Sequence, residues 1–164
     1  MANILELKNI NKIYGEKIKT QVLFDINLNF EESSFNSIIG ASGSGKSTLM
    51  NIIGTLDKAT SGEVIIDGKN ISNMSKDQLA ILRNETIGFI FQFHYLLPEF
   101  TVLENVLIPY IIKHNKVTKE ALNRAKDLIE IVGLTKVKDN KATDISGGQQ
   151  QRAAIARSLI NSPR

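Results

Sequence analysis

A glycine- and serine-rich stretch in the first third of the chain has the residues of a phosphate-binding loop. It fits the pattern G-x-x-x-x-G-K-[ST] and consists of Gly40, Ala41, Ser42, Gly43, Ser44, Gly45, Lys46, Ser47 and Thr48. Glycines let the backbone turn tightly and direct its N–H groups inward, toward a bound anion. In this P-loop motif the Lys46 ammonium reaches the β- and γ-phosphates, and the Ser47 hydroxyl binds Mg²⁺. The stretch therefore predicts a site for nucleotide phosphates.

A P-loop acts only between a strand that precedes it and a helix that follows it. The apolar run at residues 35–39 predicts a short buried strand, and residues 48–53 predict the start of a helix. The helix N-terminus adds a partial positive charge that faces the same point as the loop. A chance glycine-rich turn is the alternative, with a frequency on the order of 10⁻⁵ per position at average composition. The flanking pattern favours the phosphate site.

A second helix start carries similar chemistry near the other end of the chain. Ser146 and Gln149 have the spacing of a capping box, and Gly147 and Gly148 occupy the first turn between them. Bare backbone N–H groups beside a hydroxyl form a second anion site. A well-capped structural helix explains the same residues equally well, so both interpretations stay open at this point.

Alternating and continuous apolar runs predict the remaining strands. Residues 4–10 and 22–30 alternate as half-buried strands and favour antiparallel pairing. Residues 63–69 predict a strand that ends on an Asp-Gly turn. Residues 87–91 predict a fully buried strand, with Gln92 at its carboxyl end, where α/β sheets bind ligands. Helices are predicted at residues 75–83, 101–108, 118–132 and 146–160.

Composition excludes several classes of protein. The 164 residues, 42% hydrophobic and 23% charged, suit one soluble globular domain. A net charge of +3 is too small to predict nucleic-acid binding. No cysteine is present, which excludes a disulfide framework and a thiolate zinc site. No apolar run reaches the roughly 18 residues of a membrane span, and the first four residues lack a signal-peptide pattern. We therefore expect a cytoplasmic protein.

Residues 145–149, Ile-Ser-Gly-Gly-Gln, resemble the signature motif of ATP-binding cassette (ABC) ATPases, with Ile where the family usually has Leu. Gln92 matches the family's Q-loop glutamine, and Tyr14 matches the aromatic residue that stacks on adenine. With the P-loop, these residues fall in the family's order over essentially the whole chain. The resemblance implies ATP and Mg²⁺ as ligands. It also implies catalytic roles for Lys46 and Gln92, and Mg²⁺ binding by Ser47 and Gln92.

The resemblance also implies a fold and a mode of assembly. The fold is an α/β P-loop NTPase: a RecA-like core with an antiparallel β subdomain, and an inserted α-helical signature subdomain. Residues 1–93 would form the ATP-binding core and residues 94–158 the helical subdomain, with the continuation of the core missing after residue 164. Two copies in this family pair head to tail, with each nucleotide between one P-loop and the partner's signature helix. This would explain two phosphate sites in one chain.

The segment after the Q-loop glutamine narrows the resemblance. Residues 88–101, followed by residues 103–106, resemble the ATP-binding subunits of lipoprotein-releasing transporters, which belong with the macrolide-export group. The implied partners are two integral membrane subunits that dock near the Q-loop. Phe93, Tyr95 and Phe100 would help to form that groove, although each could equally belong to a subdomain core.

The resemblance places the protein on the cytoplasmic face of the cell membrane, bound peripherally and without nucleic acid. His94 fits a surface or interface better than a metal site, because no second ligand stands at a useful spacing. A macrolide-export ATPase, in which a membrane domain follows in the same chain, is one alternative function. A nucleotide-binding module without catalysis is the other.

The family's next strand, Walker B, would begin where the sequence ends, at residues 158–164. Its aspartate and adjacent glutamate, the D-loop and the switch histidine are absent, and neither His94 nor His114 is placed to substitute. Phosphoryl transfer depends on such positioning and charge stabilisation. We therefore expect no ATP hydrolysis at a family-like rate, and an unstable sheet with unpaired strand edges. A fragment of a longer coding sequence is the expected explanation.

Overall fold

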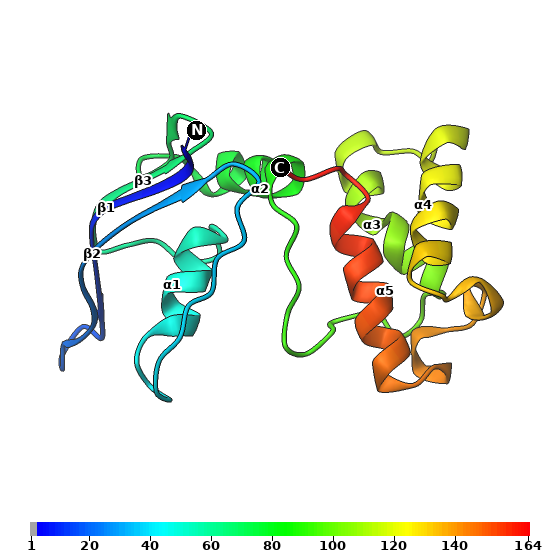
Figure 1. Ribbon diagram of the computed structural model, residues 1–164, viewed down its shortest axis with the longest axis horizontal. Helices are drawn as coiled ribbons and strands as arrows, with labels where there is room; N and C mark the ends of the chain where they lie inside the picture. Colours follow the sequence, from blue (N-terminus) through cyan, green and yellow to red (C-terminus); the bar gives the residue numbers. More distant parts are fainter. Residues whose placement is uncertain (1–2) are drawn as a thin grey trace. The chain divides into compact units, whose positions relative to one another are not determined.

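The computed structural model describes residues 3–164, which form two compact units, Met1–Ala80 and Ile81–Arg164 (Figure 1). The first two residues of the N-terminal stretch considered above lie outside the described residues. Each unit is described by itself below. The subdomain boundary after residue 93 stays a prediction.

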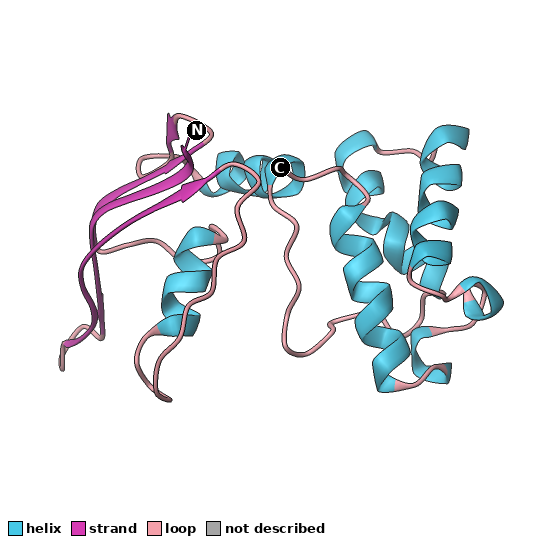
Figure 2. Ribbon diagram, in the orientation of Figure 1, coloured by secondary structure: helices cyan, strands magenta, loops and turns pink. Residues whose placement is uncertain are grey.

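The first unit contains a four-stranded antiparallel sheet in the order β2-β1-β3-β4, drawn in magenta in Figure 2. Its strands are β1 (Asn3–Tyr14), β2 (Thr20–Glu31), β3 (Ser61–Ile66) and β4 (Lys69–Asn70). The predicted antiparallel pairing of the first two strands is confirmed, with Leu7 opposite Leu28. Strand β1 continues past its predicted end because residues up to Tyr14 still pair with β2.

A bulge in β1 determines which side chains face the core. Leu5 and Leu7 are buried in the alternating pattern of a strand, but the next buried residue is Ile10. Asn9 takes a left-handed conformation with φ 52°, and the register with β2 shifts between Leu7 and Ile10. An extra residue moves the side chains that follow to the opposite face. Lys12 therefore turns inward after Ile10 and is buried as well.

The helix predicted after the P-loop is present as α1 (Lys46–Ile53). Its buried residues Leu49 and Ile52 join Ile10, Leu23 and Val64 in the core of the unit. The predicted Asp-Gly turn joins β3 to β4, with positive φ at both of its residues. Helix α2 (Lys76–Thr86) follows and contains the boundary between the two units, and Ser75 and Gln78 form its predicted capping box.

The strands predicted at residues 35–39 and 87–91 are wrong. Within residues 3–164 neither segment forms a strand, and both are irregular. Phe35 is 99% exposed and Ile39 is 91% exposed, so the first of these apolar runs is not buried. An apolar run predicts burial, but a strand also needs a backbone partner, and neither segment has one among the described residues. Gln92 therefore follows an irregular segment rather than a strand.

The second unit is helical. It contains α3 (Val102–His114), α4 (Lys119–Ile131), two 3-10 turns at Thr135–Val137 and Ala142–Asp144, and α5 (Gly147–Leu159). The predicted caps Thr101, Thr118 and Ser146 are all confirmed. The buried core of this unit consists of Val102, Val106, Leu107, Ala121, Ala125, Leu128, Ile129, Leu134, Ile145, Ala153, Ala156 and Ile160.

Helix α3 continues past its predicted end and contains Pro109. Pro109 has no N–H to donate to the carbonyl four residues earlier, that of Asn105. The Pro109 carbonyl accepts hydrogen bonds from the side chains of Asn84 and Asn161. No helix within residues 3–164 is both long enough and apolar enough to cross a membrane.

Candidate nucleotide site

The P-loop of the first unit closes around the Lys46 ammonium. Lys46 Nζ donates to the carbonyls of Gly40 at 2.9 Å and Ala41 at 2.7 Å, and reaches the Ser44 hydroxyl at 3.5 Å. Gly43 and Gly45 have φ of 78° and 90°, a conformation that residues with a Cβ rarely adopt. The motif predicted from spacing is therefore a loop whose lysine ammonium is held by the loop's own carbonyl oxygens.

Helix α1 presents its N-terminus to this loop without competition from side chains. Its N-cap is Gly45, which has no side-chain hydrogen bond to offer, and no acidic residue stands in the first turn. The first N–H groups of a helix have no partner within the helix, and the helix dipole favours negative charge there. Ser47, in the same turn, is exposed. The arrangement can bind phosphate oxygens through backbone donors and a lysine.

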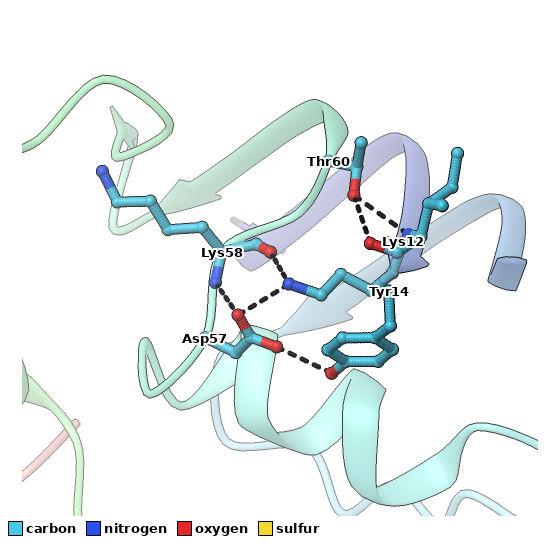
Figure 3. A network of polar contacts seen from close by, with 6 residues as sticks. Lys12, Tyr14, Asp57, Lys58 and Thr60 are labelled. Atoms are coloured by element: carbon cyan, nitrogen blue, oxygen red, sulfur yellow. Dashed lines mark hydrogen bonds and ion pairs between the residues drawn. The ribbon is translucent and has the colours of Figure 1, made fainter. Parts of the chain in front are cut away.

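Tyr14 lies at the end of β1 in a network of polar contacts (Figure 3). Its hydroxyl donates to Asp57 Oδ2 at 2.7 Å, while Lys12 Nζ donates to Asp57 Oδ1 at 2.7 Å. Burial raises the pKa of Asp57, but the hydrogen bonds from Lys12, Tyr14 and the Lys58 N–H outweigh it, so the pKa lies below its ordinary value. Tyr14 remains 41% exposed.

Gln92 is exposed in the second unit and is followed by an aromatic segment. Phe93 and Tyr95 are both well exposed, and they line a hollow of about 390 Å³. The other lining residues are His94, Leu96, Pro98, Ala142, Thr143 and Gln150. Tyr95 has φ 47°, which is unusual for an aromatic residue and requires support from its surroundings.

Two side chains, the partly buried Arg157 and the buried Asn105, hold this segment in place. Arg157 of α5 donates to the carbonyls of His94 and Tyr95, each at 2.7 Å. Burial lowers the pKa of the Arg157 guanidinium. Asn105 of α3 is fully buried and bonds the backbone of Leu97 through both its oxygen and its nitrogen. The backbone of the exposed aromatic segment is therefore held by side chains of α3 and α5.

The start of α5 carries the predicted capping box. Ser146 Oγ accepts from the Gln149 N–H, and Gln149 Oε1 accepts from the Ser146 N–H. A Cβ on Gly147 or Gly148 would meet nothing within 4 Å, and neither glycine has a positive φ. Neither packing nor backbone conformation within this chain therefore requires glycine at these two positions.

The predicted site residues fall into two groups. Tyr14 and the P-loop belong to the first unit, and Gln92 and the start of α5 belong to the second. Sequence reasoning missed Lys12, Asp57, Asn105 and Arg157. A lysine in an alternating strand looks solvent-exposed, so only knowledge of the bulge at Asn9 could have placed Lys12 inside.

Comparison with known proteins identifies the class. The family described as ABC transporter matches residues 23–164. The chain therefore belongs to the ABC transporter family of ATPases. A dimeric ATP-binding cassette solved in a post-hydrolysis state, bound to ADP and Pi, matches with a TM-score of 0.90 and 44% sequence identity. That match covers 97% of this chain and 70% of the solved one, and it confirms the predicted α/β P-loop fold.

Individual relatives narrow the comparison. The lipoprotein-releasing system ATP-binding protein LolD 1 of Rhodopseudomonas palustris is 44% identical, over 99% of this chain and 73% of its own length. The macrolide export ATP-binding/permease protein MacB of Mannheimia succiniciproducens is 50% identical, over 97% of this chain but 25% of its own length. The chain thus resembles a whole small ATP-binding subunit over most of that subunit's length, and only a quarter of a fused exporter.

Proposed function

We propose that this chain is the ATP-binding subunit of an ABC transporter that couples ATP binding and hydrolysis to the release of lipoproteins from the cytoplasmic membrane. The observation that carries the proposal is the match to the LolD relative over 99% of the chain. The P-loop supports the nucleotide part, because the Lys46 ammonium lies within the loop and the loop leads directly into a helix N-terminus.

The proposed nucleotide contacts follow from the P-loop and from Tyr14. Residues 40–48 bind the phosphates of ATP, with Lys46 as the cation, and the exposed face of the Tyr14 ring stacks on adenine. Mg²⁺ prefers oxygen ligands and uses few of them from protein. The Ser47 hydroxyl and the Gln92 side-chain oxygen fit that preference, and both residues are exposed. When bound, Mg²⁺ neutralises charge on the transferred phosphate, a transfer in which Lys46 and Gln92 take the catalytic roles.

The start of α5 is proposed to contact the nucleotide of a second copy of the chain. Ser146, Gly147, Gly148 and Gln149 are the contacting residues in this head-to-tail pair. Open space in front of both glycines supports this role. Packing within the chain does not explain why these two residues are glycine, whereas the close approach of a nucleotide from a second copy would. The dimeric relative bound to ADP and Pi supports pairing as well.

The hollow beside Phe93 and Tyr95 is the proposed contact with two integral membrane subunits. Large exposed aromatic side chains around a concave surface are typical of protein interfaces. Phe100 is more covered than either of them but is still exposed. This contact would hold the protein at the cytoplasmic face of the membrane, as a peripheral subunit without nucleic acid.

Export of macrolides is the second candidate, because the MacB relative is the more identical of the two over the shared residues. Purified membrane subunits of both transporter types, each reconstituted in nanodiscs, discriminate between them. We expect Mg²⁺- and ATP-dependent binding of the chain to the lipoprotein-releasing pair only. Binding to the exporter's membrane domain alone would overturn the proposal in favour of the alternative. If a Lys46→Ala variant binds ATP as tightly as the unchanged chain, the proposed ATP-binding role of the P-loop is wrong.

A further inference from the structure

The end of β1 is fastened to the segment that follows α1. The Thr60 N–H donates to the Asn11 carbonyl at 2.8 Å, and the Ile13 N–H donates to Thr60 Oγ1 at 3.0 Å. Lys12 Nζ donates to the Lys58 carbonyl at 2.7 Å. Figure 3 shows the contacts of Lys12 with Lys58 and those of the Thr60 hydroxyl. Together with the Thr60–Asn11 backbone bond, these contacts fix the backbone on either side of Lys12.

The Tyr14 side chain is fixed as well, through one carboxylate. Asp57 Oδ2 accepts from the Tyr14 hydroxyl, while Oδ1 accepts from Lys12 Nζ and from the Lys58 N–H, each at 2.7 Å. Hydrogen bonds to an ionised acceptor are stronger than those between neutral groups. The Asp57 backbone is itself bonded to the Asn51 carbonyl within α1 at 3.1 Å. The tyrosine hydroxyl is therefore tied to a rigid point.

Lys12 covers one face of the Tyr14 ring. Its Nζ lies 4.7 Å from the ring centroid, in the geometry of a cation–π contact. Lys12 is only 8% exposed, so this ammonium is part of the interior and not a mobile surface group. One face of the ring is thus occupied by Lys12, while Tyr14 as a whole remains 41% exposed.

We propose that Asp57 and Lys12 are positioning residues for the nucleobase: they hold the Tyr14 ring in one orientation, with a single face open, before the nucleotide arrives. This inference rests on the proposed stacking of Tyr14 on adenine. A side chain that is already ordered loses less freedom on binding, so preorganisation increases affinity without any new contact to the ligand. Neither positioning residue touches the base itself.

Tyr14→Phe is the most direct test in the full 164-residue chain. It keeps the ring and the Lys12 contact but removes the hydroxyl that bonds Asp57. Calorimetric titration with Mg²⁺ and ATP should give a Kd raised about three- to tenfold, the range expected for ordering one side chain. Titration with inorganic tripolyphosphate, which has no base, should give an unchanged Kd. A general structural role would change both Kd values or neither.

Asp57→Ala should raise the Kd for ATP by a similar factor. The double variant Tyr14→Phe/Asp57→Ala should raise the Kd no further, since the two substitutions remove the same hydrogen bond. Because Asp57→Ala leaves the buried Lys12 without its carboxylate, Lys12→Met/Asp57→Ala removes both charges and repeats the comparison in a chain without that penalty. This variant should also bind ATP more weakly and tripolyphosphate normally.

Tyr14→Ala distinguishes the stacking of Tyr14 on adenine from the positioning of Tyr14 by Asp57 and Lys12. If it raises the Kd for ATP while Tyr14→Phe does not, stacking holds and positioning is wrong. If Tyr14→Ala also leaves the Kd unchanged, the stacking assignment itself fails. Equal weakening of ATP and tripolyphosphate by Tyr14→Phe contradicts positioning in either case.

Discussion

Gly45 combines a left-handed backbone with close packing against β2. Its φ is 90°, and a Cβ there would lie 2.9 Å from Leu23 Cδ2 and 3.0 Å from the Val22 carbonyl oxygen. A left-handed conformation costs an L-residue about 1–2 kcal/mol. Pressing a methyl group against β2 adds about 1–3 kcal/mol of overpacking. Gly45→Ala should therefore lower the free energy of unfolding by about 2–5 kcal/mol, the sum of both terms.

Substitutions at two other glycines distinguish the backbone strain of a positive φ from the steric contact with β2. Gly43 and Gly68 have φ of 78° and 72°, and a Cβ at either would meet nothing within 4 Å. Gly43→Ala and Gly68→Ala should each cost only the strain, about 1–2 kcal/mol. Gly43 lies in the P-loop and Gly68 in the β3–β4 turn, so only Gly68→Ala should leave ATP affinity unchanged.

Urea unfolding followed by circular dichroism measures these differences, provided that the slope of each transition stays constant across the series. Calorimetric titration of the same proteins with ATP measures the site. If Gly45→Ala destabilises the chain no more than Gly68→Ala, the contact with β2 does not constrain the loop and the reasoning is refuted.

Three further predictions concern the second unit and pH. Arg157→Ala should lower the free energy of unfolding by about 1.5–3 kcal/mol and weaken binding to the membrane subunits, since two carbonyls lose a charged donor. Arg124→Ala, which frees two carbonyls at the end of α5, should destabilise the chain but spare that binding. Gly148→Leu should leave ATP binding by one chain intact and abolish ATP-dependent pairing in sedimentation; equal loss of both would contradict the role in trans. The pKa values of Asp57 and Glu104 lie below their ordinary values, so the stabilisation from both carboxylates is complete only above about pH 5. It is lost as pH falls through the lowered pKa values, and acid titration of the urea midpoint checks this loss.

Short-range signals in the sequence predicted what short-range chemistry determines. The caps at Thr101, Thr118 and Ser146 depend on residues three positions away, and all three are present. The Asp67-Gly68 turn is equally local. The alternation predicted in β2 is wrong in phase, because Leu23 is buried while Phe24 is exposed and Asp25 takes a positive φ. Helix ends were less certain, because α3 continues through a proline.

Contacts between residues far apart in the chain could not be predicted from the sequence. The runs at residues 35–39 and 87–91 have strand composition, yet a strand forms only where a second backbone supplies hydrogen bonds. The partnership of Lys12 with Asp57 joins residues far apart in the chain, and it depends on the change of phase at Asn9. Family resemblance predicted a role for Tyr14, but nothing local to Tyr14 predicts which carboxylate holds its hydroxyl.

The length of helix α1 sets the spacing between the two parts of the proposed nucleotide site. It begins at Lys46 of the phosphate loop, and the turn at its other end, bonded to Asn51, carries the carboxylate that holds Tyr14. One residue inserted into the helix would advance that turn by about 1.5 Å and rotate it by about 100°. Every motif residue would still be present, but the groups proposed to hold the two ends of one nucleotide would no longer be in register. A chain of this family can therefore lose its site through a change in helix length alone.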